Sequence, residues 1–144
     1  MKRHTLRGQF TEGETKRLII DDGRLTHAMK VISFVIAGEP SSSGHDAFAT
    51  LSLESSGGLT WNWGDNRQIA WAATNFTGTG SADAPFTVID PDHLVIQDLY
   101  IQGSVGSAGG TDVINYLIEL EAVEISNDQS ILQMIKERSQ NASR

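Results

Sequence analysis

The chain of 144 residues contains no cysteine. This absence excludes thiol catalysis, cysteine-based zinc sites and disulfide frameworks, and it fits synthesis inside a cell. No stretch approaches the roughly 18 consecutive apolar residues that a membrane-spanning helix needs. The basic N-terminus is not followed by the apolar segment of a secretory signal. The sequence therefore predicts an unprocessed protein that is not inserted in a membrane.

Catalytic and metal-binding signatures are also missing. The four histidines show neither H-x-H nor i, i+4 spacing, which metal ligands favour. The glycine-rich stretch 103–110 lacks the lysine and the following helix of a phosphate-binding loop. Segment 41–45 (SSSGH) has no accompanying oxyanion-stabilising element, and segment 90–93 (DPDH) predicts a turn rather than a cation site or an acid/base pair. We therefore expect a non-enzymatic protein without a cofactor or a metal.

Basic residues are scarce in the body of the chain. Residues 1–30 carry seven Lys and Arg against four Asp and Glu, whereas residues 31–135 carry only Arg67 against thirteen acidic residues. The tail 136–144 is basic again, with three bases against one acid. The acidic body disfavours direct contact with nucleic acid. An acidic body with basic ends suits head-to-tail contact between copies, and a solvated surface with inert ends is the alternative.

What the sequence does contain is a series of short segments with alternating polarity. The longest, 112–125, places Ile118 and Leu120 on one face and Glu119 and Glu121 on the other. This period of two predicts a half-buried strand with a central place in a sheet.

A second long strand is predicted over 26–37, with Ile32, Phe34 and Ile36 on one face. Further strands are predicted over 16–20, 47–53, 68–74, 85–89 and 94–102, and 59–67 is predicted to be a strand followed by a turn. Roughly seven or eight strands separated by turn signals, with almost no helix, indicate an all-β protein. We predict an antiparallel β-sandwich over 16–125, with a jelly-roll-like topology as the first choice.

Terminal segments flank the predicted sandwich. Residues 1–15 are polar and predict an extended N-terminal arm, which we expect a neighbouring subunit to hold. Ser126 and Gln129 have the spacing of a capping box, so 126–144 predicts one short C-terminal helix and a tail. A helix this short needs a packing partner. We predict an assembly interface formed by residues of both ends: Arg3, Arg7, Phe10, Ile131, Leu132, Ile135 and Arg138.

A group of tryptophans lies in the middle of the sequence. Trp61 and Trp63 could form a carbohydrate-binding face, because sugars stack on exposed tryptophan rings. Anchors of the core or of a subunit interface are the alternative. Arg67 is expected to pair with a nearby acid such as Asp65, in a structural rather than a catalytic contact.

Several stretches resemble proteins of one kind. They are 17–24 (RLIIDDGR) leading into 29–34 (MKVISF), 61–71 (WNWGDNRQIAW), and 114–121 (INYLIELE) with 137–140 (ERSQ). These stretches resemble small proteins encoded among the structural genes of marine tailed bacteriophages.

The resemblance implies a virion protein made in the host cytoplasm. It points to a capsid cement or decoration protein that binds its own copies and a major capsid protein or another virion protein. A head–tail connector or tail protein is one alternative. A carbohydrate-binding β-sandwich that uses Trp61 and Trp63 is the alternative from a different functional class.

Overall fold

A computed structural model describes residues 3–20, 27–38, 45–55, 60–76, 86–95, 98–105 and 113–124. None of these residues belongs to a helix long and apolar enough to cross a membrane. They form eight strands: β1 (Arg3–Thr11), β2 (Lys16–Ile19), β3 (His27–Gly38), β4 (His45–Ser52), β5 (Gln68–Phe76), β6 (Phe86–Ile89), β7 (Asp98–Val105) and β8 (Val113–Glu124).

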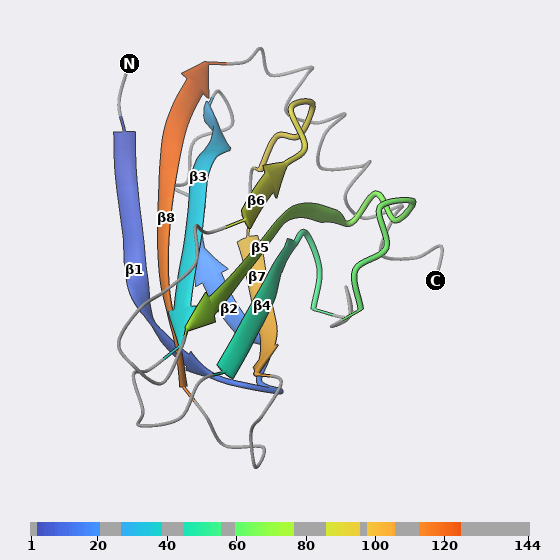
Figure 1. The fold of residues 1–144 in the computed structure, drawn as a ribbon. Helices are drawn as coiled ribbons and strands as arrows, with labels where there is room; N and C mark the ends of the chain where they lie inside the picture. The colour runs from blue at the N-terminus through green and yellow to red at the C-terminus, as the bar shows by residue number, and fades with distance from the viewer. Residues whose placement is uncertain are drawn as a thin grey trace.

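The strands form two antiparallel sheets packed face to face, with the orders β1-β8-β3 and β2-β7-β4-β5-β6 (Figure 1). The two halves of the chain pair in reverse order, since β1 pairs with β8, β2 with β7 and β4 with β5. β3 lies beside β6, where the Thr87 hydroxyl donates to the Phe34 carbonyl at 2.8 Å. These pairings are those of a jelly roll, except that β6 pairs with β5 of the other sheet and contacts β3 without a ladder. The predicted antiparallel, jelly-roll-like β-sandwich is therefore confirmed.

The hydrophobic core fills the space between the two sheets. Burying one large aliphatic or aromatic side chain there contributes about 1.5–3 kcal/mol. The predicted alternation of 112–125 is confirmed, because β8 buries one face and lies between β1 and β3. The largest fully buried apolar side chains are Phe34, Leu51, Ile69, Leu99, Ile101, Ile114, Ile118, Leu120 and Val95.

β3 departs from the predicted alternation. Its register with β8 shifts between Val31 and Ser33, which marks a β-bulge. Val31 and Phe34 are both buried, whereas Ile32 is only half-buried. The prediction that Ile32 shares a face with Phe34 is wrong, because the extra residue of the bulge changes the phase of the alternation.

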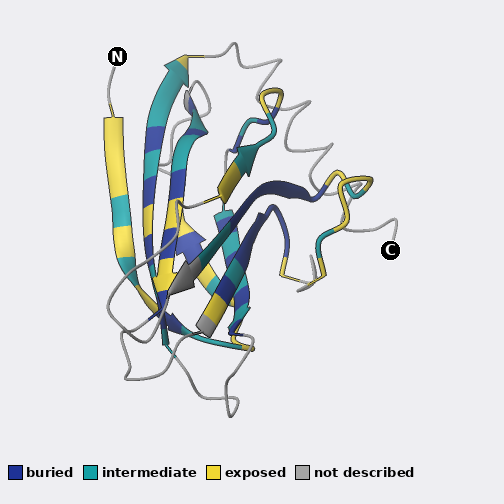
Figure 2. Ribbon diagram, in the orientation of Figure 1, coloured by how far each residue is buried: buried dark blue, intermediate teal, exposed yellow. Residues whose placement is uncertain are grey.

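The N-terminal segment is a strand of the sandwich. Residues 3–11 were expected to belong to an arm, but they form β1, which pairs with β8 along its whole length. Phe10 is 3% exposed, and its ring centroid lies 6.1 Å from that of Tyr116. The prediction of an arm held by a neighbouring subunit is thus corrected for these residues, which are held by their own sheet. Most of β1 nevertheless remains exposed (Figure 2).

Two further predicted strands differ from the structure, and the predicted helix lies outside the described residues. The strand expected over 94–102 begins as a single bridge between Val95 and Met29, and β7 then runs from Asp98 to Val105. Residues 60–67 contain turns but no strand. The helix and tail predicted over 126–144 lie outside the described residues.

Candidate functional site

Aromatic side chains gather on the outer face of the five-stranded sheet. Ala47, Ala49 and Leu51 of β4 are buried in the core, so the alternating Phe48 and Thr50 point to the other face. The strand registers place the outward-facing side chains in rows. One row is Phe86, Ala73, Phe48 and Ser104, and the next is Val88, Trp71, Thr50 and Gln102.

The loop 60–67 is bound to this sheet by Gln68, which is 2% exposed. The Gln68 side-chain amide donates to the Thr60 carbonyl at 2.9 Å. Its oxygen accepts hydrogen bonds of 2.9 Å from the Asn62 main-chain N–H and from the Trp71 indole. Because one buried amide serves three partners, it fixes the loop relative to β5.

This anchoring places Trp61 between two aromatic rings of the same row. Trp61 stacks on Phe86, with ring centroids 5.9 Å apart and an interplanar angle of 20°. It meets Phe48 edge-on, at 6.1 Å and 88°. Ala73 occupies the sheet position between Phe48 and Phe86 and has only a methyl group, so the row has space for the larger indole.

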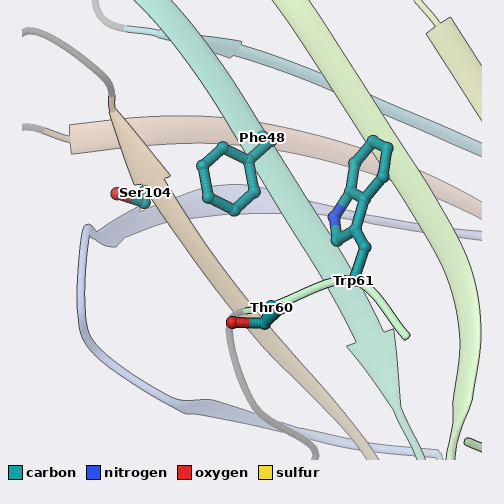
Figure 3. Close-up of a pocket in the computed structure, with 4 residues that line it drawn as sticks. All are labelled: Phe48, Thr60, Trp61 and Ser104. Atoms are coloured by element: carbon teal, nitrogen blue, oxygen red, sulfur yellow. The ribbon is translucent and has the colours of Figure 1, made fainter.

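A hollow of about 490 Å³ opens beside Trp61, lined by Phe48, Thr60, Trp61 and Ser104 (Figure 3). Its walls combine two aromatic rings with two hydroxyl groups. The indole nitrogen of Trp61 lies on the edge of the ring turned toward Phe48 (Figure 3). This nitrogen is shielded from solvent, and no acceptor among the described residues bonds to it.

Trp63 lies apart from the lining of the hollow. It is 63% exposed, and its ring lies 5.8 Å from that of Trp71. Trp61 and Trp63 therefore both belong to the aromatic surface, as the carbohydrate alternative required, but only Trp61 lines the hollow.

Arg67 anchors the end of the loop. It is 6% exposed, and its Nε donates to Asp65 Oδ1 at 2.7 Å while its terminal nitrogens pair with Asp65 and Glu54. The hydrogen bonds from Arg67 hold the pKa of Asp65 below its ordinary value. The predicted pairing of Arg67 with Asp65 is confirmed, whereas Glu54 was not foreseen. Since both carboxylates are buried with the cation, the contact is structural.

The segment 90–93 is a turn, as predicted. The Asp92 main-chain N–H donates to Asp90 Oδ1 at 2.9 Å. His93 is buried, and its Nε2 accepts a 2.9 Å hydrogen bond from the Val31 N–H at the bulge of β3. Burial lowers the pKa of His93 and so favours the neutral imidazole that this bond requires. Within the described ranges, no three His, Asp or Glu side chains gather in a way that could hold a metal ion.

The residues of the predicted assembly interface have different locations. Arg3 and Arg7 are exposed on β1, whereas Phe10 lies in the core of its own sandwich. Phe10 is therefore a core residue rather than an interface residue. The other four residues, Ile131, Leu132, Ile135 and Arg138, lie outside the described part of the chain.

Sequence reasoning missed most of the hollow. Phe48, Thr60 and Ser104 come from three separate segments, and only the strand registers bring them together. One signal was present, because Phe48 alternates with the small and apolar residues of its strand and is the only aromatic residue on the otherwise polar face of 47–53.

Comparison with protein-family models, with curated proteins and with solved structures finds no match to this chain.

Proposed function

We propose that the protein is a non-enzymatic structural subunit of a bacteriophage virion, a capsid cement or decoration protein that associates with its own copies and binds the shell. The likeness of 17–24, 61–71 and 114–121 to structural proteins of marine tailed phages supports this proposal. The fold is compatible with it, because jelly rolls occur in viral capsid domains as well as in lectins. A fold alone does not determine function, so the proposal depends on a surface that can make the contacts.

The open edge of β1 is the observation that carries the proposal. β1 is the terminal strand of its sheet, and no described strand pairs with its other edge. It has nine residues, and an open strand edge of this length offers main-chain donors and acceptors to a neighbouring chain. Arg3 and Arg7 are exposed on this strand and give the edge a positive charge.

The charges favour a contact between unlike surfaces. If β1 paired with β1 of a second copy around Thr5, Arg3 would lie opposite Arg7, and like charges in that position are destabilising. Residues 31–135, in contrast, carry thirteen acidic residues against one basic residue. A basic edge meeting an acidic surface is a heterologous contact, which repeats from copy to copy around a closed ring or over a shell.

Sedimentation velocity of the whole chain over a range of concentrations tests the proposal. We expect self-association that weakens as salt is added, because exposed charges beyond about 10 Å are screened at 0.1 M salt. The double variant R3E/R7E should remain monomeric where the wild type associates. Arg17→Glu is the matched control, because Arg17 is exposed on β2 of the other sheet and pairs there with Asp98 at 3.0 Å.

Association of the R17E variant should equal that of the wild type. A wild-type chain that is monomeric at every concentration, or an R3E/R7E variant that associates like the wild type, would contradict the proposal. Binding to the shell is measured by co-sedimentation with phage capsids, which should also be weaker for R3E/R7E than for R17E.

A further inference from the structure

We propose that the hollow beside Trp61 is a binding site for a neutral saccharide ring. This inference goes beyond the assembly role and does not depend on it, because the hollow lies on the outer face of the five-stranded sheet and β1 belongs to the other sheet. The size of the hollow, its lining and one buried polar atom support such a ligand.

The size and the lining fit a small amphipathic ligand. A volume of about 490 Å³ is within the range of small-molecule sites, roughly 300–1,000 Å³. Such sites combine mostly apolar walls with a few polar groups that orient the ligand. Here Phe48 and Trp61 supply the apolar wall, and Thr60 and Ser104 supply hydroxyl groups. A sugar ring has the matching surfaces, since its C–H face stacks on an aromatic ring and its hydroxyls donate and accept hydrogen bonds at the edge.

The unpartnered indole nitrogen of Trp61 is the second observation. A buried tryptophan N–H usually has a hydrogen-bond acceptor, and a buried donor without one is costly. No described residue provides that acceptor, although the nitrogen lies on the edge of the indole turned toward Phe48 (Figure 3). Because the nitrogen is shielded from solvent, a ligand oxygen can accept from it only if the indole of Trp61 turns toward the hollow as the ligand binds. The donor therefore favours a ligand that carries oxygen over a purely apolar one.

The charge around the hollow favours a saccharide over a nucleic-acid base as its ligand. Bases also stack on aromatic side chains, but their phosphates require a basic groove. Among the described residues that line the hollow, none is charged, and Arg67, the one basic residue of 31–135, is already paired with two carboxylates. A proline-rich peptide also docks on aromatic rings, but it lies along an extended groove. The described residues line an open hollow, so a proline-rich peptide is included as a competing ligand in the test below.

Variants of the lining residues and of one neighbour test the site. Trp61→Ala and Phe48→Ala remove the two aromatic walls. Trp61→Phe keeps a ring but removes the N–H, and Ser104→Ala removes one hydroxyl. Trp63→Ala is the matched control, because it removes an exposed indole of the same loop that does not line the hollow.

The measurement is calorimetric titration of the full chain with a panel of neutral saccharides: glucose, galactose, mannose, N-acetylglucosamine and their linear oligomers. We expect at least one member to bind. Trp61→Ala and Phe48→Ala should weaken its binding by about tenfold or more, and Trp61→Phe and Ser104→Ala by a few fold. Trp63→Ala and the R3E/R7E variant should bind as the wild type does.

Circular dichroism identifies any variant that has lost the fold. If an alanine variant of an aromatic residue unfolds, Trp61→Phe and Ser104→Ala still test the site.

Three results would overturn the proposal. One is the absence of binding by every saccharide at about 10 mM, well above the concentrations at which weak sites fill. Another is saccharide binding that Trp63→Ala abolishes and Trp61→Phe and Ser104→Ala leave unchanged. The third is tighter binding of a PxxP peptide or of oligo-dT than of any saccharide at the same residues. None of these results concerns self-association through β1. The saccharide proposal can therefore be wrong while the assembly proposal is right, and the reverse.

Discussion

The outer faces of the two sheets are built differently. On the three-stranded sheet, Arg3, Glu121 and Lys30 lie side by side in one row, and Gln9 donates to Asn115 at 2.8 Å in an exposed hydrogen bond. On the five-stranded sheet, the outer face carries aromatic rings, and the loop over them is fixed by the buried polar side chains Gln68 and Arg67.

The two faces differ in their polar side chains, which are buried under the loop of the five-stranded sheet and exposed on the three-stranded sheet. An exposed polar row exchanges hydrogen bonds with water at little net gain. A buried amide or ion pair, in contrast, must have all its partners in place, and a loop held in this way keeps its side chains in one geometry. Loops fixed on a rigid scaffold are common positions for binding residues. This difference supports the two proposals, ligand binding on the five-stranded face and assembly at the β1 edge of the other sheet.

The largest effect is expected at Arg67. Replacing it with alanine leaves Glu54 and Asp65 buried without their cation, so Arg67→Ala should lower the free energy of unfolding by about 3–5 kcal/mol. Chemical denaturation measures this loss. The triple variant E54Q/D65N/R67M removes the charges together and should recover much of the stability. A loss below about 1 kcal/mol for Arg67→Ala would mean that the cluster does not anchor the loop.

A smaller effect on stability is expected at Gln68 of the five-stranded sheet, compared with Gln9 of the three-stranded sheet. Gln68→Ala leaves the Thr60 carbonyl, the Asn62 N–H and the Trp71 indole without their partner, and should cost about 1–3 kcal/mol. Gln9→Ala removes one exposed hydrogen bond and should change stability by at most about 0.5 kcal/mol. Both are measured by urea denaturation. Equal losses for the two variants would remove the distinction between the faces.

The smallest expected effect is a dependence of stability on pH through His93. Burial is the main cause that lowers its pKa in the folded state, and Lys30 adds to it, whereas the contact with Asp90 acts in the opposite direction. The unfolded chain therefore binds a proton first. Stability should be full above the ordinary histidine pKa of about 6.5 and should fall as the pH drops below that value toward the lower folded pKa.

Denaturation curves of the wild type and of His93→Gln between neutral pH and mildly acidic pH test this dependence. Glutamine can accept the Val31 N–H hydrogen bond but does not titrate, so the variant should lose part of the slope. The same slope in both proteins would assign it to other groups.

Much of the fold could be predicted, because most strands bury one face. The alternation of Tyr116, Ile118, Leu120 and Ala122 identified the central strand β8, in which the first three are buried and Ala122 is half-buried. β1 was missed because it is an edge strand with few apolar residues. Its Gly8 has a packing reason that the sequence does not show, since a Cβ there would lie 2.9 Å from the Tyr116 hydroxyl.

The candidate site could be predicted only in part. The tryptophans and the pairing of Arg67 with Asp65 are close in sequence and were recognised. Phe48 and Ser104 lie opposite each other only through the register of β4 with β7, which no local pattern specifies. The bulge at Val31 was missed for a similar reason, because the His93 side chain that accepts its N–H is far away in sequence.

The division of roles between the two sheets is tested most directly by amide hydrogen exchange of one protein in two experiments. We expect that raising the protein concentration slows exchange in residues 3–11, and that adding the saccharide that binds slows exchange in 60–67 and not in 3–11. Slowed exchange of the same segment in both experiments, or of neither segment in either, would contradict it.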